Sequence, residues 1–115
     1  MPTPLISLDR DTVVCERCEL ADGPLTRLRG LLGRASLEPG EGLLLRPSAA
    51  VHTMFMRFPI DVVFLDRDRR VLDIRADVKP WRAAARRGAR EVLELAAGEG
   101  SHRGLRVGER LELSR

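Results

Sequence analysis

Several residue types that most chains of this size contain are absent or rare in this sequence. It has no Tyr, Asn or Gln, and Lys79 is the one lysine among its 20 basic residues. A GC-rich genome accounts for a shortage of Asn, Tyr and Lys, but it does not account for the absence of Gln. Loss of the heat-labile amides together with 32% charged residues is typical of thermophilic proteins, and we expect such a source.

Long apolar runs and cysteine clusters are missing as well. No segment approaches the roughly 20 apolar residues of a bilayer-spanning helix, and the start of the chain lacks the charged and apolar regions of a signal peptide. Two cysteines are too few for a disulfide-rich scaffold. The sequence therefore predicts a soluble, cytoplasmic protein without a membrane partner. Its 115 residues, 43% of them apolar, fit one globular domain over residues 1–115.

What is present is the pattern of a small β-rich single domain of the α+β class. Apolar alternation and continuous apolar runs predict strands at residues 12–21, 43–46, 60–65, 70–78, 91–96 and 110–113. Pro24 and leucines at helical spacing predict one main helix near residues 24–34. This spacing of strands favours a barrel-like or sandwich-like sheet. We expect 60–65 to be an interior strand, because it is apolar on both faces, and 1–10 to be a tail or an edge segment.

Cys15 and Cys18 have the C-x-x-C spacing of redox and zinc sites. In a strand, however, residues three apart point to opposite faces, so the two thiols can meet only at a bulge or a turn. A structural zinc site needs four ligands, and His52 and His102 supply no recognised spacing. We therefore predict no disulfide between these cysteines, no metal and no cofactor, with Cys18 the more buried thiol.

The densest segment of the chain runs from residue 51 to residue 66. If residues 51–58 are extended, His52, Met54, Met56 and Phe58 lie on one face. There the histidine and the two thioethers could bind a soft ion such as Cu(I), or Met54 and Met56 could simply fill the core. The sequence leaves both interpretations open and favours the second.

Asp61 lies inside an otherwise apolar strand, so its carboxylate needs a buried partner. Arg34, Arg57 and His52 are the candidates. Pro59 has no N–H and interrupts strand pairing, which leaves room for a cleft. We expect Asp61 to meet His52 or to share Arg34 with it; a purely structural role, in which Asp61 ties a strand to a loop, stays open.

Arginine clusters at 67–70 and 82–90, together with a net charge of +3, raise the question of nucleic acid. Acidic residues interrupt the first cluster. Base stacking also needs exposed aromatic side chains among basic ones, and the chain has three Phe and one Trp, mostly in apolar surroundings. Nucleic-acid binding through these arginines is therefore kept only as a lesser alternative, and we do not expect it.

Five segments stand in the order that one known family shows: RGLLGR at 29–34, GLLL at 42–45, HTMFMRFPIDVVFLD at 52–66, PW at 80–81 and VLEL at 92–95. From about Cys18 to Leu113 the chain resembles the uncharacterised domain-of-unknown-function family one hundred and ninety-two. The resemblance implies a compact β-rich domain without an established activity. The Cys15 and Cys18 pair is not part of the shared pattern.

The favoured function is a non-catalytic binding domain with a cleft for a small polar or anionic ligand. Its predicted site residues are Arg34, His52, Thr53, Met56, Asp61 and Trp81. The alternative is a small enzyme in which His52 and Asp61 act as an acid–base pair, although no nucleophile or cofactor motif accompanies them. The pattern specifies neither the ligand nor an oligomeric state.

Overall fold

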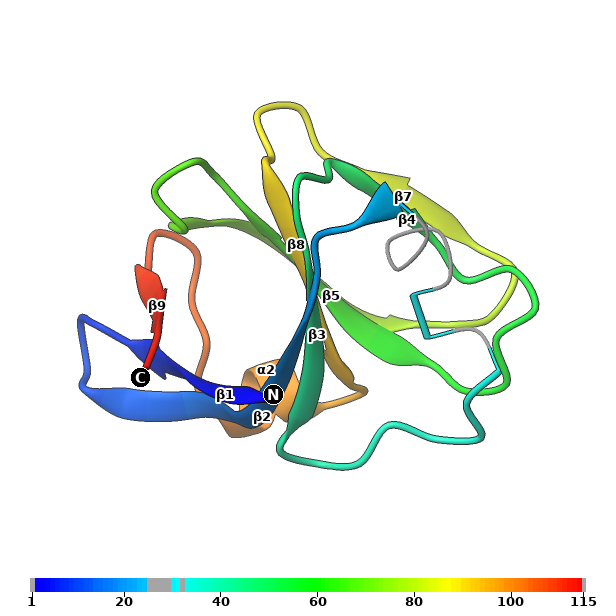
Figure 1. The fold of residues 1–115 in the computed structure, drawn as a ribbon, viewed down its shortest axis with the longest axis horizontal. Coiled ribbons are helices and arrows are strands. Elements are labelled where there is room, and N and C mark those ends of the chain that lie inside the picture. The colour runs from blue at the N-terminus through cyan, green and yellow to red at the C-terminus, as the bar shows by residue number, and fades with distance from the viewer. Residues whose placement is uncertain (1, 25–29, 32, 115) are drawn as a thin grey trace.

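The computed structural model describes residues 2–24, 30–31 and 33–114, and it is built mainly of β-strands (Figure 1). The elements are β1 (Thr3–Ser7), β2 (Thr12–Ala21), β3 (Glu41–Leu45), β4 (Ala50–His52), β5 (Ile60–Leu65), β6 (Val71–Val78), β7 (Ala83–Ala85), β8 (Glu91–Ala96), α2 (Glu99–His102) and β9 (Leu111–Leu113). Among the described residues, no helix has the length and hydropathy that crossing a bilayer requires.

Seven strands form one curved sheet in the order β6-β5-β8-β3-β2-β1-β9, and β4 pairs with β7 in a separate two-stranded sheet. In the seven-stranded sheet, every pair of neighbouring strands is antiparallel except the parallel pair β2–β3. The two end strands meet, because the Val71 N–H donates to the Glu109 carbonyl (2.8 Å) and the Leu111 N–H to the Arg69 carbonyl (2.9 Å). The sheet thereby closes on itself as a barrel, which is one of the two architectures that the sequence left open.

The central strands contribute side chains to two separate apolar clusters, because successive residues of a strand point to opposite faces. The barrel core contains Leu5, Val14, Cys15, Cys18, Leu44, Val63, Leu65, Val71, Leu93, Leu95, Leu105 and Leu111. The outer core, on the other face, contains Ala21, Leu31, Leu37, Leu43, Leu45, Met56, Ile60, Val62, Phe64, Ala89, Val92 and Ala96. Which face a residue occupies decides what it can contact.

The strands predicted from long apolar patterns are confirmed, and β5 is interior and fully buried between β6 and β8. Residues 3–7 are not a tail or an edge but form β1, between β2 and β9. The expected extension of 51–58 is wrong, since β4 ends at His52 and a turn follows. The helix predicted near 24–34 falls largely on residues outside the described part of the chain.

Candidate ligand-binding surface

Asp61 is buried on β5 and accepts hydrogen bonds from three backbone N–H groups. Its Oδ1 accepts from Asp77 (2.9 Å) and Gly98 (3.1 Å), and its Oδ2 accepts from Gly100 (2.8 Å). Asp77 lies in a bulge of β6, where the register against β5 shifts. Asp61 therefore joins this bulge to the start of α2, which is the structural role that the sequence left open.

The predicted trio of Arg34, His52 and Asp61 is not formed. Arg34 pairs with Glu19 of β2 (2.9 Å), and His52 is exposed at the end of β4. The physical reason is strand alternation: Asp61 shares its face of β5 with the barrel-core residue Val63, whereas the segment after His52 covers the outer core. The acid–base pair of the enzyme hypothesis therefore has no geometric support.

Thr53 is a buried hub between two loops. Its Oγ1 donates to the Lys79 carbonyl (2.6 Å) and accepts from the Arg82 N–H (2.8 Å), while its own N–H donates to the Arg82 carbonyl (2.7 Å). Its carbonyl accepts from the N–H groups of Met56 (3.2 Å) and Trp81 (2.9 Å). These bonds hold the 53–56 turn and the 79–82 loop in fixed positions relative to each other.

Phe55 and Trp81 lie in the two loops that Thr53 joins, and both side chains are exposed. Their ring centroids are 4.7 Å apart and the ring planes meet at 61°, yet the two residues remain 72% and 55% exposed. Both have a left-handed backbone, with φ of 64° and 67°, which costs a residue with a Cβ about 1–2 kcal/mol. We define the aromatic platform as this pair together with the exposed Met54.

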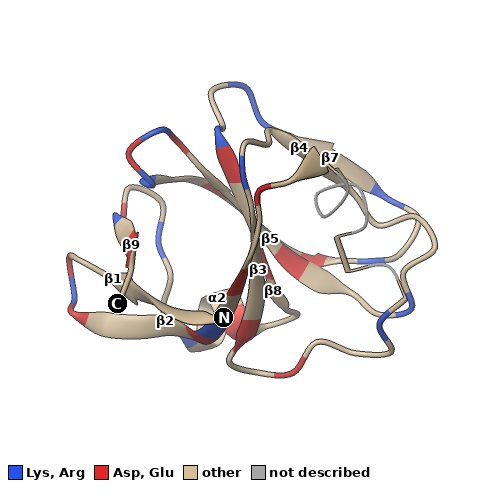
Figure 2. Ribbon diagram, viewed as in Figure 1, with Lys and Arg blue, Asp and Glu red and all other residues tan. Residues whose placement is uncertain are grey.

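Basic side chains adjoin the aromatic platform. Arg57 follows Phe55 by two residues, and Arg82 follows Trp81 directly; both are exposed. Among the described residues, the Arg82 guanidinium donates to the carbonyls of Pro80 and Trp81, and Arg57 has no ion-pair partner. Elsewhere in the described part of the chain, basic residues are spread over several loops, and acidic residues lie between them (Figure 2).

Of the predicted site residues, the structure brings Thr53 and Trp81 together by direct hydrogen bonding and buries Met56 beneath them in the outer core. Phe55 was missed, because an extended 51–58 segment places it on the face opposite Met56. The sequence carries no turn signal there, and the left-handed conformation is imposed by the Thr53 contacts. Two described hollows, of about 470 and 210 Å³, are lined by other residues.

A second buried carboxyl was also missed. Glu94 of β8 is 3% exposed, and its Oε1 has no hydrogen-bond partner in the described part of the chain. It points toward the outer core, between Leu43 of β3 and Val62 of β5. Burial raises the pKa of Glu94 to about 7. The cost argument that singled out Asp61 in its apolar strand applies equally to Glu94 between Leu93 and Leu95.

The expectation that Cys15 and Cys18 point to opposite faces of the strand is wrong. Both thiols are fully buried in the barrel core, and both are free. The pairing of β2 with β1 explains this result: Leu5 faces Cys15 and Thr3 faces Cys18, so β2 carries one extra residue between them. Such a bulge reverses the alternation. No group of three or more metal-binding side chains occurs among the described residues.

The fold and the aromatic platform together define a small barrel-like domain with an exposed aromatic surface. The chain belongs to the family DUF192, described as Uncharacterized ACR, whose model matches residues 6–113. It is 29% identical over 113 residues to a UPF0127 protein of Thermococcus sibiricus, covering 94% of this chain and 73% of that protein. That relative comes from a thermophilic archaeon, which fits the missing amides.

Two crystal structures show the same fold. One is a protein of unknown function from Novosphingobium aromaticivorans, with a TM-score of 0.84, 27% identity, and coverage of 95% of this chain and 83% of that chain. The other, from Sinorhizobium meliloti, is described as a candidate transcription regulator; it has a TM-score of 0.84, 26% identity, and coverage of 96% and 91%. The family description and the first structure leave the function open.

Proposed function

We propose that this protein is a non-catalytic binding domain for a small anion that carries a planar ring. The ring stacks on the open face of Trp81, and the anionic group lies toward Arg57 and Arg82. The observation that carries this proposal is the Phe55–Trp81 pair, in which two large aromatic residues are exposed on a left-handed backbone.

Exposure and backbone strain together support a binding role. A folded chain gains free energy by burying Phe and Trp side chains, and here the backbone instead adopts an unfavourable conformation that leaves them in solvent. Strained backbone that surrounding contacts enforce is concentrated at ligand-binding sites. Since the two rings pack edge to face, a ligand ring does not enter between them and stacks on the exposed surface of Trp81.

The charge beside the platform selects an anion. Arg57 and Arg82 carry no acidic partner in the described structure, whereas the carboxylate of Asp77 is paired with Lys79 (2.7 Å). A guanidinium offers a planar set of N–H donors that matches a carboxylate or a phosphate. The site is one-sided and open, so it supplies binding without the enclosed donor groups that an acid–base reaction needs.

Trp81 makes the proposal directly testable, because it is the only Trp of a chain without Tyr. Its fluorescence reports on the platform itself. We expect a saturable change in this fluorescence on titration with AMP, flavin mononucleotide or pyridoxal phosphate, and a weaker response to adenosine. Inorganic phosphate has no ring to stack and leaves the signal unchanged.

Calorimetry on variants locates the binding. Trp81→Ala should abolish heat release with the planar anion that binds, and Arg82→Gln should weaken binding about tenfold through loss of a charged hydrogen bond. Arg106→Gln removes an exposed arginine from the loop after α2 and serves as the matched control, with unchanged affinity. Failure of all three planar anions to bind contradicts the proposal.

An oligothymidylate strand distinguishes a free ligand from nucleic acid. If the strand binds tightly and mononucleotides do not, the ligand is single-stranded nucleic acid, which stacks its bases on exposed aromatics next to basic groups. This result would overturn the small-ligand proposal and restore the lesser alternative.

A further inference from the structure

The bulge in β2 places two thiols together inside the barrel. Cys15 and Cys18 both have zero exposure and belong to the same apolar cluster. The bulge turns both side chains to the same face of β2, and a side-chain hydrogen bond joins the two thiols. A C-x-x-C pair in a regular strand could not achieve this, because its side chains would lie on opposite faces.

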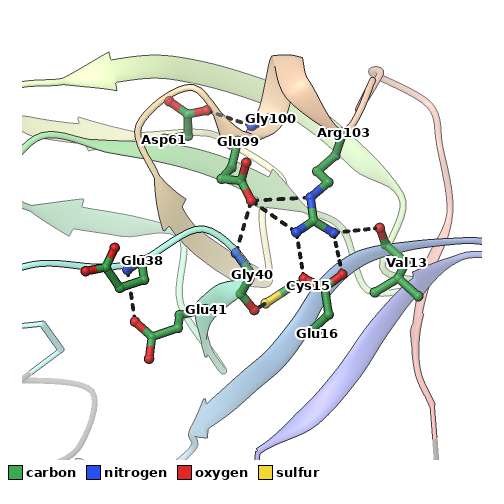
Figure 3. A network of polar contacts seen from close by, with 10 residues as sticks. All are labelled: Val13, Cys15, Glu16, Glu38, Gly40, Glu41, Asp61, Glu99, Gly100 and Arg103. Carbon is green, nitrogen blue, oxygen red and sulfur yellow. Dashed lines mark hydrogen bonds and ion pairs between the residues drawn. The ribbon is translucent and has the colours of Figure 1, made fainter.

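The Cys15 sulfur atom is closely packed by neighbouring backbone atoms and side chains. Its thiol donates to the Gly40 carbonyl at 3.4 Å, and a Cβ at Gly42 would come within 2.8 Å of Sγ. Figure 3 shows that Gly40 also belongs to a polar network, in which its N–H donates to Glu99 (3.1 Å). Arg103 connects Glu99 (3.2 Å) to Glu16 (2.6 Å), the residue next to Cys15.

We propose that Cys15 and Cys18 form a dithiol that hydrogen peroxide oxidises to an intramolecular disulfide. In the first step, Cys15 Sγ attacks one peroxide oxygen, the O–O bond breaks, and a water molecule leaves as Cys15 becomes a sulfenic acid. In the second step, Cys18 Sγ attacks the Cys15 sulfur, the S–O bond breaks, and a second water leaves with the Cys18 proton. The two thiols are oxidised by two electrons and one peroxide is reduced.

The order of attack follows from the different surroundings of the two thiols. Cys15 contacts the Gly40 carbonyl beside the network of Arg103, whereas Cys18 contacts the Glu19 carbonyl at 3.9 Å. The Cys18 thiol lowers the pKa of Cys15, and the nearby Arg103 guanidinium acts in the same direction. The Cys15 thiol and burial both raise the pKa of Cys18. Since the thiolate is the nucleophile, Cys15 reacts first with peroxide and Cys18 resolves the sulfenic acid.

A small oxidant suits this site because neither sulfur is exposed. Glu16 and Arg17, the residues between the two cysteines, are both exposed on the outer side of β2. Local opening of this bulge is therefore the shortest route from solvent to the sulfur atoms, and hydrogen peroxide needs only a narrow one. A bulky disulfide such as oxidised glutathione needs a much larger opening, which predicts slow reaction with it.

The test uses the full chain, fully reduced and then exposed to hydrogen peroxide while folded. After unfolding and alkylation of the remaining thiols, we expect an unalkylated species lighter by two hydrogen atoms, and a reductant restores two alkylation sites. The Cys18→Ser variant should stop at a sulfenic acid that dimedone traps. The matched Cys15→Ser variant should stay unmodified under the same conditions.

Peptide mapping of the wild-type protein after brief oxidation with dimedone present covers the case in which a variant does not fold. The adduct should then lie on Cys15 and not on Cys18. The proposal is overturned if the folded protein keeps both thiols while the urea-unfolded chain is oxidised, if Cys18 is trapped first, or if the disulfide joins two chains.

Discussion

Asp61 uses its carboxylate to hold backbone segments together, and its replacement should affect stability and not binding. Asp61→Ala leaves three backbone donors without an acceptor, those of Asp77, Gly98 and Gly100. We expect the free energy of unfolding to fall by about 3 kcal/mol, measured by urea denaturation, with unchanged ligand affinity at Trp81 once the variant is folded.

Asp73 provides the control for this measurement. It is a partly exposed carboxylate paired with Arg75 (2.8 Å), and loss of such a surface pair costs at most about 1 kcal/mol. If Asp61→Ala is no more destabilising than Asp73→Ala, the three backbone bonds do not have the structural role assigned to them.

Glu94 should make the protein less stable as the pH rises from acid to neutral. Its pKa is about 7 in the folded chain and near 4.5 when unfolded, so between these values the folded state holds a proton that the unfolded state has lost. Stability from this group is full below about pH 4.5 and is lost as the pH rises through 7, by about 3 kcal/mol in all.

The variant Glu94→Gln isolates this contribution, because the amide is neutral at every pH. Compared with the wild-type protein, it should gain stability at pH 8 and show a flatter pH profile in thermal denaturation. Glu112→Gln, an exposed position on β9, should reproduce the wild-type profile. A parallel profile for Glu94→Gln would contradict the raised pKa.

At the scale of elements, the parallel pair β2–β3 depends on the absence of a side chain at Gly42. A methyl group there would lie 2.8 Å from Cys15 Sγ and 3.0 Å from Leu95 Cδ2. Gly42→Ala should therefore destabilise the protein by about 1–3 kcal/mol through overpacking, measured by chemical denaturation.

The double variant Gly42→Ala/Cys15→Ala tests the cause. Removing the sulfur relieves the closer of the two contacts, so the two substitutions should cost less together than the sum of their separate effects. Strict additivity would show that the Cys15 sulfur is not what limits the space at Gly42.

The elements that could be predicted from sequence are those whose apolar pattern is long. The strands at 12–21 and 60–65 were predicted without tertiary information, from β-branched residues in the first segment and a continuous apolar run in the second. The turn after His52 and the short helix α2 depend on distant partners, Lys79 and Arg82 for Thr53 and the carboxylate of Asp61 for Gly100. No local pattern encodes such partners.

The candidate site was predicted only in part for the same reason. Thr53 and Trp81 were identified, but the exposure of Phe55 follows from a backbone conformation that the sequence does not reveal. The prediction that Cys15 and Cys18 lie on opposite faces was wrong because the bulge arises from pairing with β1. The sequence had suggested that this segment is a tail or an edge. The sequence predicted that the Asp61 carboxylate is buried. It did not predict that the partners of this carboxylate are backbone N–H groups.

For the whole molecule, the two apolar clusters should unfold together. The strands β3, β5 and β8 send alternate residues into the barrel core and the outer core, so neither cluster can be lost while the other stays intact. Urea transitions followed by Trp81 fluorescence and by far-ultraviolet circular dichroism should therefore coincide. Separate midpoints would show that the platform loops melt before the barrel.

The pairing of β1 with β9 brings the two ends of the chain together, so the barrel does not depend on where along the chain its termini lie. Ser114 donates its N–H to the Pro4 carbonyl at 2.8 Å, so the first and last strands are immediate neighbours. A circularly permuted gene, with a short linker between these ends and new termini at the exposed Arg67–Asp68 peptide, would keep every strand pairing of the barrel. We therefore expect the permuted chain to fold to the same barrel, with its opening at a different point.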